Sequence, residues 1–138
     1  MKFKKFREDV KTPTRKHSTD GGLDVFMPET FSIQPFETLC LGLGFGIEVP
    51  KGYAIMLIPR SSIAKKGIIS QTQIIDSGYQ GEIHLIITNC SNNTYVFEKD
   101  DRLVSLITCK YLEEDMEEVE NFTEISERGV NGLGSSGK

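Results

Sequence analysis

Short apolar runs recur along the chain, and each run ends at residues that favour turns. The main runs cover residues 39–49, 53–58, 82–89 and 102–109. The segments between them are rich in Pro, Gly, Asn, Asp and Ser, which end strands or form turns. Short strands separated by turns at such intervals are typical of a β-sandwich or a β-barrel. The pattern therefore predicts an all-β fold.

Glycine alternates with bulkier residues inside the first of these runs, at Gly42, Gly44 and Gly46. Glycine weakens a strand, but it allows a neighbouring backbone to approach closely. We therefore expect another part of the chain to pack tightly against this strand.

The segment QIIDSGYQGEI at 73–83 has strand-like residues at both ends and turn formers in its middle. Asp76, Ser77 and Gly78 suit a hairpin tip, because they favour tight backbone turns. Tyr79 does not fit this simple interpretation, since an exposed aromatic ring is costly unless something covers it.

The length and charge of the chain limit the classes of function. A chain of 138 residues with 38% hydrophobic residues is sufficient for one modest core. The formal net charge of −4 argues against broad nucleic-acid binding, which needs a basic face. No apolar run is long enough to span a membrane, and the basic N-terminus lacks the apolar stretch of a signal peptide. We expect a soluble intracellular protein, cytoplasmic or otherwise.

The cysteines and histidines do not form a recognisable metal or catalytic motif. Cys40, Cys90 and Cys109 are an odd number at wide spacings, so we expect buried, inert thiols without disulfides or zinc. His17 and His84 lack nearby partners and are expected to be ordinary structural or surface residues.

The C-terminal part of the chain changes in composition. Residues 111–120 are acidic and predict a solvated strand or helical turn, and residues 127–138 are rich in Gly. The latter have too little apolar surface to fold alone, which predicts a β domain at 1–126 and a flexible arm at 127–138. Its backbone N–H groups, serines and Arg128 are groups that can bind a phosphate chain.

The segment PRSSIAKKG at 59–67 supports two interpretations. Arg60, Ser61 and Ser62 offer a guanidinium, two hydroxyls and free backbone amides, all of which bind anions. Alternatively, Arg60 pairs with an internal carboxylate, and the serines cap a short helix that begins near Ile63.

Five segments in order resemble the motifs of the homotrimeric dUTP pyrophosphatases, or dUTPases. They are DGGLDVF (20–26), PRSSIAKKG (59–67), QIIDSGYQGEI (73–83), KDDRLVSLI (99–107) and RGVNGLGSSG (128–137). The resemblance implies a distorted jelly-roll β-barrel and a homotrimer with active sites at subunit interfaces. It also implies Mg²⁺-dependent hydrolysis of dUTP to dUMP and pyrophosphate, which keeps uracil out of DNA and supplies dUMP for dTMP synthesis.

The resemblance also implies roles for individual residues. Asp76 would activate the water that attacks the α phosphorus, and Tyr79 would pack under deoxyribose and exclude a 2′-hydroxyl. The residues expected to bind substrate are Arg60, Ser61, Ser62, Gln73, Ile74, Tyr79, Arg128, Leu133, Gly134, Ser135 and Ser136. The supporting residues are Asp24, Asp101, Arg102 and Ser105. Mg²⁺ is expected to be held by the triphosphate and water, without a direct protein ligand.

The chain departs from the family pattern at several positions. Leu133 stands where a Phe usually stacks on uracil, and Ser105 stands where Gln is usual. Gln73 replaces a Gly three positions before the catalytic acid, and nearby Ser70 replaces an Asn. The resemblance implies that uracil is read largely by the hairpin backbone, so recognition of the base is expected to persist with altered geometry.

Two alternatives to a dUTPase stay open from the sequence. One is a nucleotide-dependent regulatory or binding protein on the same fold, with a regulatory protein partner if the chain is phage-encoded. The other is a dCTP deaminase relative, although Asp76 with Tyr79 fits the pyrophosphatase pattern. Neither nucleic acid nor a membrane is an expected partner.

Overall fold

The computed structural model describes residues 1–71, 73–124 and 129, and these form eleven strands and one short helix. The strands are β1 (Lys2–Lys5), β2 (Leu23–Phe26), β3 (Phe31–Ile33), β4 (Thr38–Gly42), β5 (Phe45–Glu48), β6 (Tyr53–Pro59), β7 (Ile68–Ser70), β8 (Gln73–Ile75), β9 (His84–Asn89), β10 (Tyr95–Phe97) and β11 (Arg102–Lys110). The helix is α1 (Ser61–Ala64). The predicted all-β fold is confirmed.

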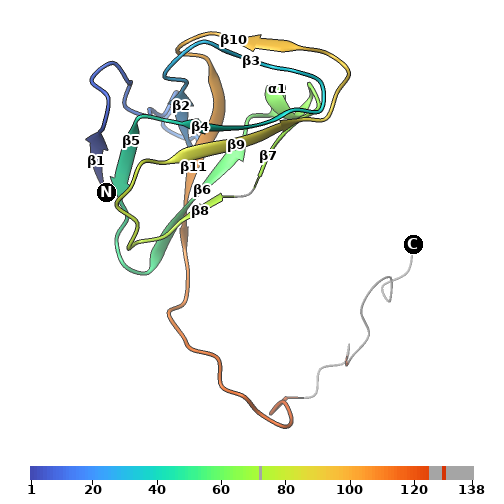
Figure 1. Cartoon of the computed structure of the whole chain (residues 1–138). Coiled ribbons are helices and arrows are strands. Elements are labelled where there is room, and N and C mark those ends of the chain that lie inside the picture. The colour runs from blue at the N-terminus through green and yellow to red at the C-terminus, as the bar shows by residue number, and fades with distance from the viewer. Residues whose placement is uncertain (72, 125–128, 130–138) are drawn as a thin grey trace.

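The strands form small antiparallel sheets around one core (Figure 1). The larger sheets have the orders β2-β11-β6-β8 and β4-β9-β7, and two further pairs are β1-β5 and β10-β3. The core contains buried side chains from all of these sheets, including Val25, Ile33, Phe45, Leu57, Leu85 and Leu103. Each sheet therefore contributes one apolar face to a shared interior.

Most of the predicted strands match observed ones, but the run at 39–49 divides into β4 and β5. Gly44 lies between them with a φ of +74°, a conformation that favours glycine and lets the chain turn. The predicted close approach is confirmed at Gly46, where an added Cβ would lie 2.7 Å from the main-chain oxygen of Gly81. The strand thus packs directly against the loop that contains Asp76.

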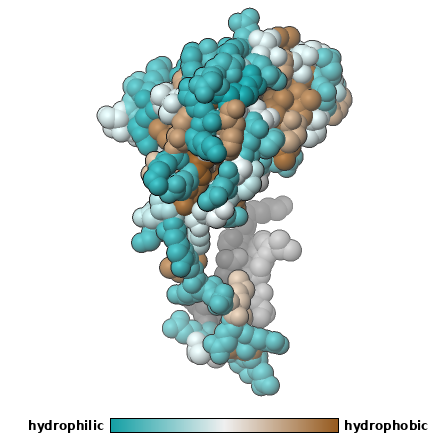
Figure 2. Space-filling view, turned by 60° about the vertical axis from the view of Figure 1, so that its left-hand side comes forward, coloured by the Kyte–Doolittle hydropathy of each residue, from teal (hydrophilic) through white to brown (hydrophobic). Residues whose placement is uncertain are grey.

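The acidic segment at 111–120 is solvated, as predicted, but it forms neither a strand nor a helical turn. It leaves the body of the molecule after β11 and extends below it in Figures 1 and 2. Leu112 and Met116 in this segment, and Phe122 just beyond it, are exposed by 79%, 102% and 89%. The described part of the chain therefore leaves these apolar side chains without cover.

The prediction that the three cysteines are buried is wrong. Cys40 and Cys90 are exposed and Cys109 is intermediate, and all three are free thiols. Cys40 lies in β4, where exposed residues alternate with partly buried ones such as Leu39. Because alternate residues of a strand point to opposite faces, the strand register and not the apolar character of the thiol decides its exposure.

The histidines behave as expected, since His17 and His84 are exposed. Within the described part of the chain, no group of three or more His, Cys, Asp or Glu residues could hold a metal ion. No helix in that part is long and apolar enough to cross a membrane.

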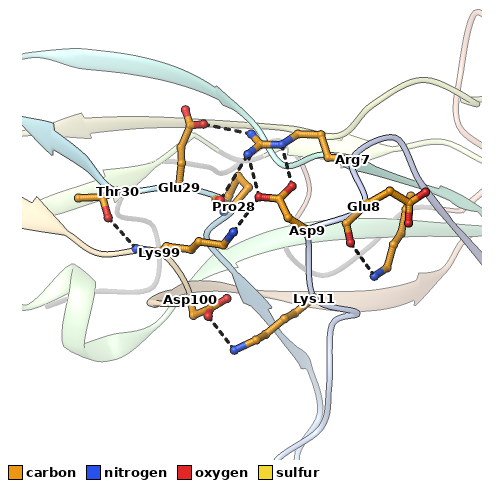
Figure 3. A network of polar contacts seen from close by, with 10 residues as sticks. Arg7, Glu8, Asp9, Lys11, Pro28, Glu29, Thr30, Lys99 and Asp100 are labelled. Carbon is orange, nitrogen blue, oxygen red and sulfur yellow. Dashed lines mark hydrogen bonds and ion pairs between the residues drawn. The ribbon is translucent and has the colours of Figure 1, made fainter.

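A network of ion pairs joins the N-terminal segment to two distant turns (Figure 3). Asp9 accepts bonds from Lys99 at 2.7 Å and from Arg7 at 3.3 Å, and Arg7 also pairs with Glu29 at 3.1 Å. The bond from Lys99, with that from Arg7, lowers the pKa of Asp9 from 3.8 to about 2. These contacts connect segments about 20 and 90 residues apart, so they fasten the N-terminal segment to the body.

Candidate functional site

The predicted turn after β8 is present, and it carries Asp76 and Tyr79. The main-chain N–H of Tyr79 donates to the carbonyl of Asp76 at 3.1 Å, which closes the turn. Asp76 is exposed to solvent, and Tyr79 is 44% exposed. The turn therefore presents a carboxylate and an aromatic ring to solvent together.

The Tyr79 ring is held in place by its own loop. Its hydroxyl donates to the carbonyl of Glu82 at 2.7 Å. The Glu82 carboxylate in turn accepts from the main-chain N–H of Gly44 at 2.7 Å. An added Cβ at Gly81 would lie only 2.5 Å from the Tyr79 hydroxyl, so the ring fits closely over this glycine. The absence of a side chain at Gly81 thus gives the tyrosine its fixed position.

A hollow of about 200 Å³ lies beside this turn, and we call it the Asp76 hollow. Its lining includes Gln73, Ile74, Asp76, Tyr79 and His84. Typical ligand pockets have volumes of about 300–1,000 Å³. The Asp76 hollow is therefore only part of a site for a ligand as large as a nucleoside triphosphate.

A second group of predicted site residues comes from β2, from β11 and from the end of β6. We call this group the arginine cluster, and its members are Asp24, Arg60, Arg102 and Ser105. Arg102 Nη1 lies 2.9 Å from Asp24 Oδ2, and Arg60 Nε lies 3.5 Å from Asp24 Oδ1. Ser105 Oγ donates to Asp24 Oδ1 at 3.1 Å. Asp24 has a side chain only 14% exposed, so this carboxylate is well placed to orient both guanidinium groups.

The arginine cluster has an excess of positive charge, because two guanidinium groups share one carboxylate. Both arginine side chains remain 33% exposed, which leaves part of each guanidinium accessible from outside. Arg60 Nη1 also donates to the main-chain oxygen of Arg102 at 3.1 Å. Fixed, partly exposed guanidinium groups are suited to binding phosphate oxygens.

The two interpretations of residues 59–67 are both realised in part. Arg60 does pair with a carboxylate, that of Asp24. The helix begins at Ser61 rather than near Ile63, and no side chain caps it, so the proposed serine cap is wrong. Ser61 and Ser62 are exposed and remain available to a ligand.

Asp101 and Arg102 follow one another in the sequence but act separately. Asp101 accepts from the main-chain N–H of Glu98 at 2.9 Å and stabilises the turn before β11, whereas Arg102 pairs with Asp24. Lys66 was not singled out from the sequence, yet it joins Arg60 and Arg102 around a hollow of about 380 Å³. Its position near two arginines, two residues after the end of α1, could be found only from the fold.

The Asp76 hollow and the arginine cluster lie toward opposite ends of β6, whose pairing with β8 is visible in Figure 1. The pairing of β6 with β8 places Ile75 opposite Ile55, so Asp76 follows at the end of β6 that contains Ala54, whereas Arg60 follows the far end of β6. At about 3.3 Å per strand residue, the six positions from Ala54 to Arg60 separate the two groups by roughly 20 Å. One chain therefore does not bring all of the predicted residues together.

The predicted residues of the fifth motif lie outside the described residues. They are Arg128, Leu133, Gly134, Ser135 and Ser136. Three departures lie within the described part, and each makes a hydrogen bond: Ser105 bonds to Asp24, Gln73 reaches across to β9, and the hydroxyl of Ser70 donates to the main-chain oxygen of Gln71.

The chain is similar over its whole length to known dUTPases. The dUTPase family model matches residues 8–137. The deoxyuridine 5′-triphosphate nucleotidohydrolase of Clostridium tetani is 33% identical over 141 residues, which cover 100% of this chain and 97% of the relative. The enzyme of that name from Corynebacterium diphtheriae is 36% identical over 133 residues and covers 94% and 87% of the two chains.

The solved structures agree with the family match. The dUTPase of Staphylococcus bacteriophage 80alpha with dUpNHpp superposes with a TM-score of 0.94 at 28% identity, over 99% of this chain and 98% of that chain. The predicted jelly-roll β fold is confirmed by this likeness, and neither a deaminase nor a purely regulatory protein is favoured. The family is generally Mg²⁺-dependent, and its members are typically homotrimers. The two residue groups, the strand topology and these matches together show that the chain belongs to the dUTPase family.

Proposed function

We propose that the protein hydrolyses dUTP to dUMP and pyrophosphate, and that Asp76 activates the attacking water at the α phosphorus. The carboxylate that carries this proposal stands exposed on the rim of the Asp76 hollow, three residues from the fixed Tyr79 ring. A single positioned carboxylate is sufficient as a general base. Most of the remaining rate acceleration then comes from positioning and from electrostatic stabilisation of the leaving pyrophosphate.

The Asp76 hollow would bind the nucleoside part of dUTP. The Tyr79 ring would pack under deoxyribose, where it leaves no room for a 2′-hydroxyl. Uracil would lie against the main chain of Gln73 and Ile74, which line the same hollow. Gly134, Ser135, Ser136 and Arg128 would close over the nucleotide, with Leu133 near the base.

The arginine cluster would bind the phosphates. Arg60 and Arg102 supply positive charge, and Ser61 and Ser62 supply hydroxyls next to them. Asp24 is already engaged by both arginines, and Asp101 by a main-chain N–H, so neither is a free metal ligand. The engagement of both carboxylates is consistent with Mg²⁺ held by the triphosphate and water. The ion would neutralise charge on the phosphate oxygens.

The separation of the two groups supports a shared active site. A triphosphate bound at the arginine cluster cannot place its α phosphorus beside Asp76 of the same chain, since roughly 20 Å of β6 separates them. A second copy of the chain must therefore supply one of the two groups. We propose a homotrimer with three such sites at its interfaces, a closed symmetry that gives every copy the same two contacts.

The test is pyrophosphate release from dUTP, UTP, dCTP and dTTP with Mg²⁺, measured for wild type, Asp76→Asn and the control Asp20→Asn. We expect hydrolysis of dUTP alone, and a fall in kcat of about 10²-fold or more for Asp76→Asn. Asp76→Asn should still bind dUTP, and Asp20→Asn should match wild type. Wild-type turnover in Asp76→Asn would overturn the role of Asp76, and no hydrolysis by the wild type would overturn the proposed activity.

A further inference from the structure

The side chain of Gln73 makes an unusual bridge between two strands. Gln73 lies in β8, which pairs with β6 and not with β9. Its side-chain amide nevertheless reaches β9, where Nε2 donates to the main-chain oxygen of His84 at 2.8 Å and Oε1 accepts from the main-chain N–H of Ile86 at 2.8 Å. A side-chain amide thus occupies the place of a main-chain partner on this edge of β9.

The edge of β9 would otherwise be open at this point. The preceding strand β7 pairs with β9 from Ile68 to Ser70, and Gln71 still donates to the main-chain oxygen of Ile86 at 3.0 Å. The chain then leaves β9, and β8 continues beside β6. The carbonyl of His84 and the N–H of Ile86 are left as an acceptor and a donor on the edge of β9 that faces away from β4, and His84 lines the Asp76 hollow together with Gln73.

This acceptor and donor select for a ligand that carries a carbonyl oxygen next to an N–H group. A ligand must present a carbonyl oxygen to the N–H of Ile86 and an N–H to the carbonyl of His84, side by side. The carboxamide of Gln73 does so, and so does uracil with its O4 and N3–H. Cytosine presents the reverse pattern, since its 4-position is an amino donor and its N3 is an acceptor.

We infer that the Gln73 carboxamide is an internal stand-in for uracil, which holds the base-reading groups of β9 in the empty site and must rotate away when the base binds. The inference rests on the proposed function, because it places uracil in the Asp76 hollow that Gln73 lines. Gln73 thereby competes with the substrate. This competition lowers the affinity for uracil nucleotides and does not change the binding of the phosphates.

The first test compares Gln73→Ala and Gln73→Asn with Gln71→Ala as the matched control. Asn keeps the amide but is one methylene too short to bridge the strands, and the Gln71 side chain is exposed. Calorimetry with dUMP should show a Kd at least about fivefold lower for both Gln73 variants, the lower end of the effect of two neutral hydrogen bonds. KM for dUTP should fall in parallel.

Two further ligands separate base reading from a general effect. Binding of dCMP should not improve, because cytosine cannot use the released groups, and inhibition by inorganic pyrophosphate should match wild type in every variant. An unchanged or weaker affinity for dUMP in folded Gln73 variants would overturn the inference. So would an equal gain for dCMP or pyrophosphate.

A second measurement uses the wild-type protein and does not depend on the folding of a variant. The side-chain NH₂ signals of Gln73, assigned by their loss in Gln73→Ala, should be protected from solvent exchange in the free protein. Saturation with dUMP should abolish that protection. Protection that persists with dUMP bound would overturn the inference alone, whereas a wild type that neither binds dUMP nor hydrolyses dUTP would overturn the proposed function as well.

Discussion

Tyr79 has a structural role in its loop, and we propose that it also binds the sugar of the substrate. Its hydroxyl bonds to the carbonyl of Glu82, and its ring lies over Gly81 while remaining 44% exposed. The bond fixes one edge of the ring, and the exposed part is free to contact a sugar. The proposed contact with the sugar would account for an aromatic residue at the tip of this turn, since its ring is already fixed in the empty site.

The two roles of Tyr79 can be separated by substitution. Tyr79→Ala should lower the preference for dUTP over UTP by about 10²-fold, the discrimination that an apolar surface achieves against an added hydroxyl. Tyr79→Phe removes only the bond to Glu82 and should keep most of the preference. Ratios of kcat/KM for the two nucleotides give the answer, and an unchanged ratio in Tyr79→Ala would assign sugar selection to another group.

Asp9 makes the stability of the protein depend on pH. Its pKa is lowered from 3.8 to about 2 by the bond from Lys99 and then by that from Arg7. A depressed folded-state pKa stabilises the folded state fully above pH 3.8, and the stabilisation disappears as the pH falls through about 2. The ionised carboxylate is therefore favourable at neutral pH.

Asp9→Asn should consequently lower the melting temperature at pH 7 by a small amount, since the groups are exposed and screened by solvent. The difference from wild type should shrink between about pH 4 and pH 2, where the wild-type carboxylate becomes protonated. Thermal unfolding at several pH values measures it. A difference that stays constant across this range would show that Asp9 acts through packing rather than charge.

At the scale of elements, the position of the Asp76 loop depends on β5. Gly46 in β5 lies directly under Gly81, and the Glu82 carboxylate bonds to the N–H of Gly44 between β4 and β5. The loop that carries Asp76 is thus supported by a pair of strands more than 30 residues earlier in the chain. The contact accounts for Gly46, and Gly42 likewise lies against the side chain of Glu82.

Gly46→Ala should disturb the support, because the new methyl would meet a main-chain oxygen at 2.7 Å, which cannot rotate away. We expect a loss of about 1–3 kcal/mol in the free energy of unfolding, together with a higher KM for dUTP. Gly21→Ala is the control, since nothing lies within 4 Å of its added Cβ. Equal denaturant midpoints for the two variants would contradict the proposed contact.

At the scale of the whole molecule, the Asp76 hollow and the arginine cluster lie toward opposite ends of β6, and the proposed function therefore requires a second chain. Asp76→Asn disables the Asp76 hollow and Arg60→Ala disables the arginine cluster, so each variant alone should be inactive. Co-refolding them in equal amounts should restore about one quarter of the wild-type activity. An intact site needs Asp76 from an Arg60→Ala chain and Arg60 from an Asp76→Asn chain, and each of these has a probability of about one half.

The control for this mixing experiment is a co-refolded mixture of Asp76→Asn with the double variant Asp76→Asn/Arg60→Ala, which has no intact Asp76 and should stay inactive. Light scattering should give the mass of three chains for every sample. Recovery no greater than the control, from trimers of mixed composition, would place both groups of a site on one chain.

The sequence by itself determined the all-β class, the turn at 76–81 and the family, since strand periodicity, turn residues and motif order are properties of neighbouring residues. Only the tertiary structure decided that Asp24 joins Arg60 to Arg102, that Gln73 caps the edge of β9, and that Cys40 faces outward. Those contacts depend on which strands pair and in which register. A shift of one residue in register would turn each of these side chains to the other face, and no local pattern records that choice.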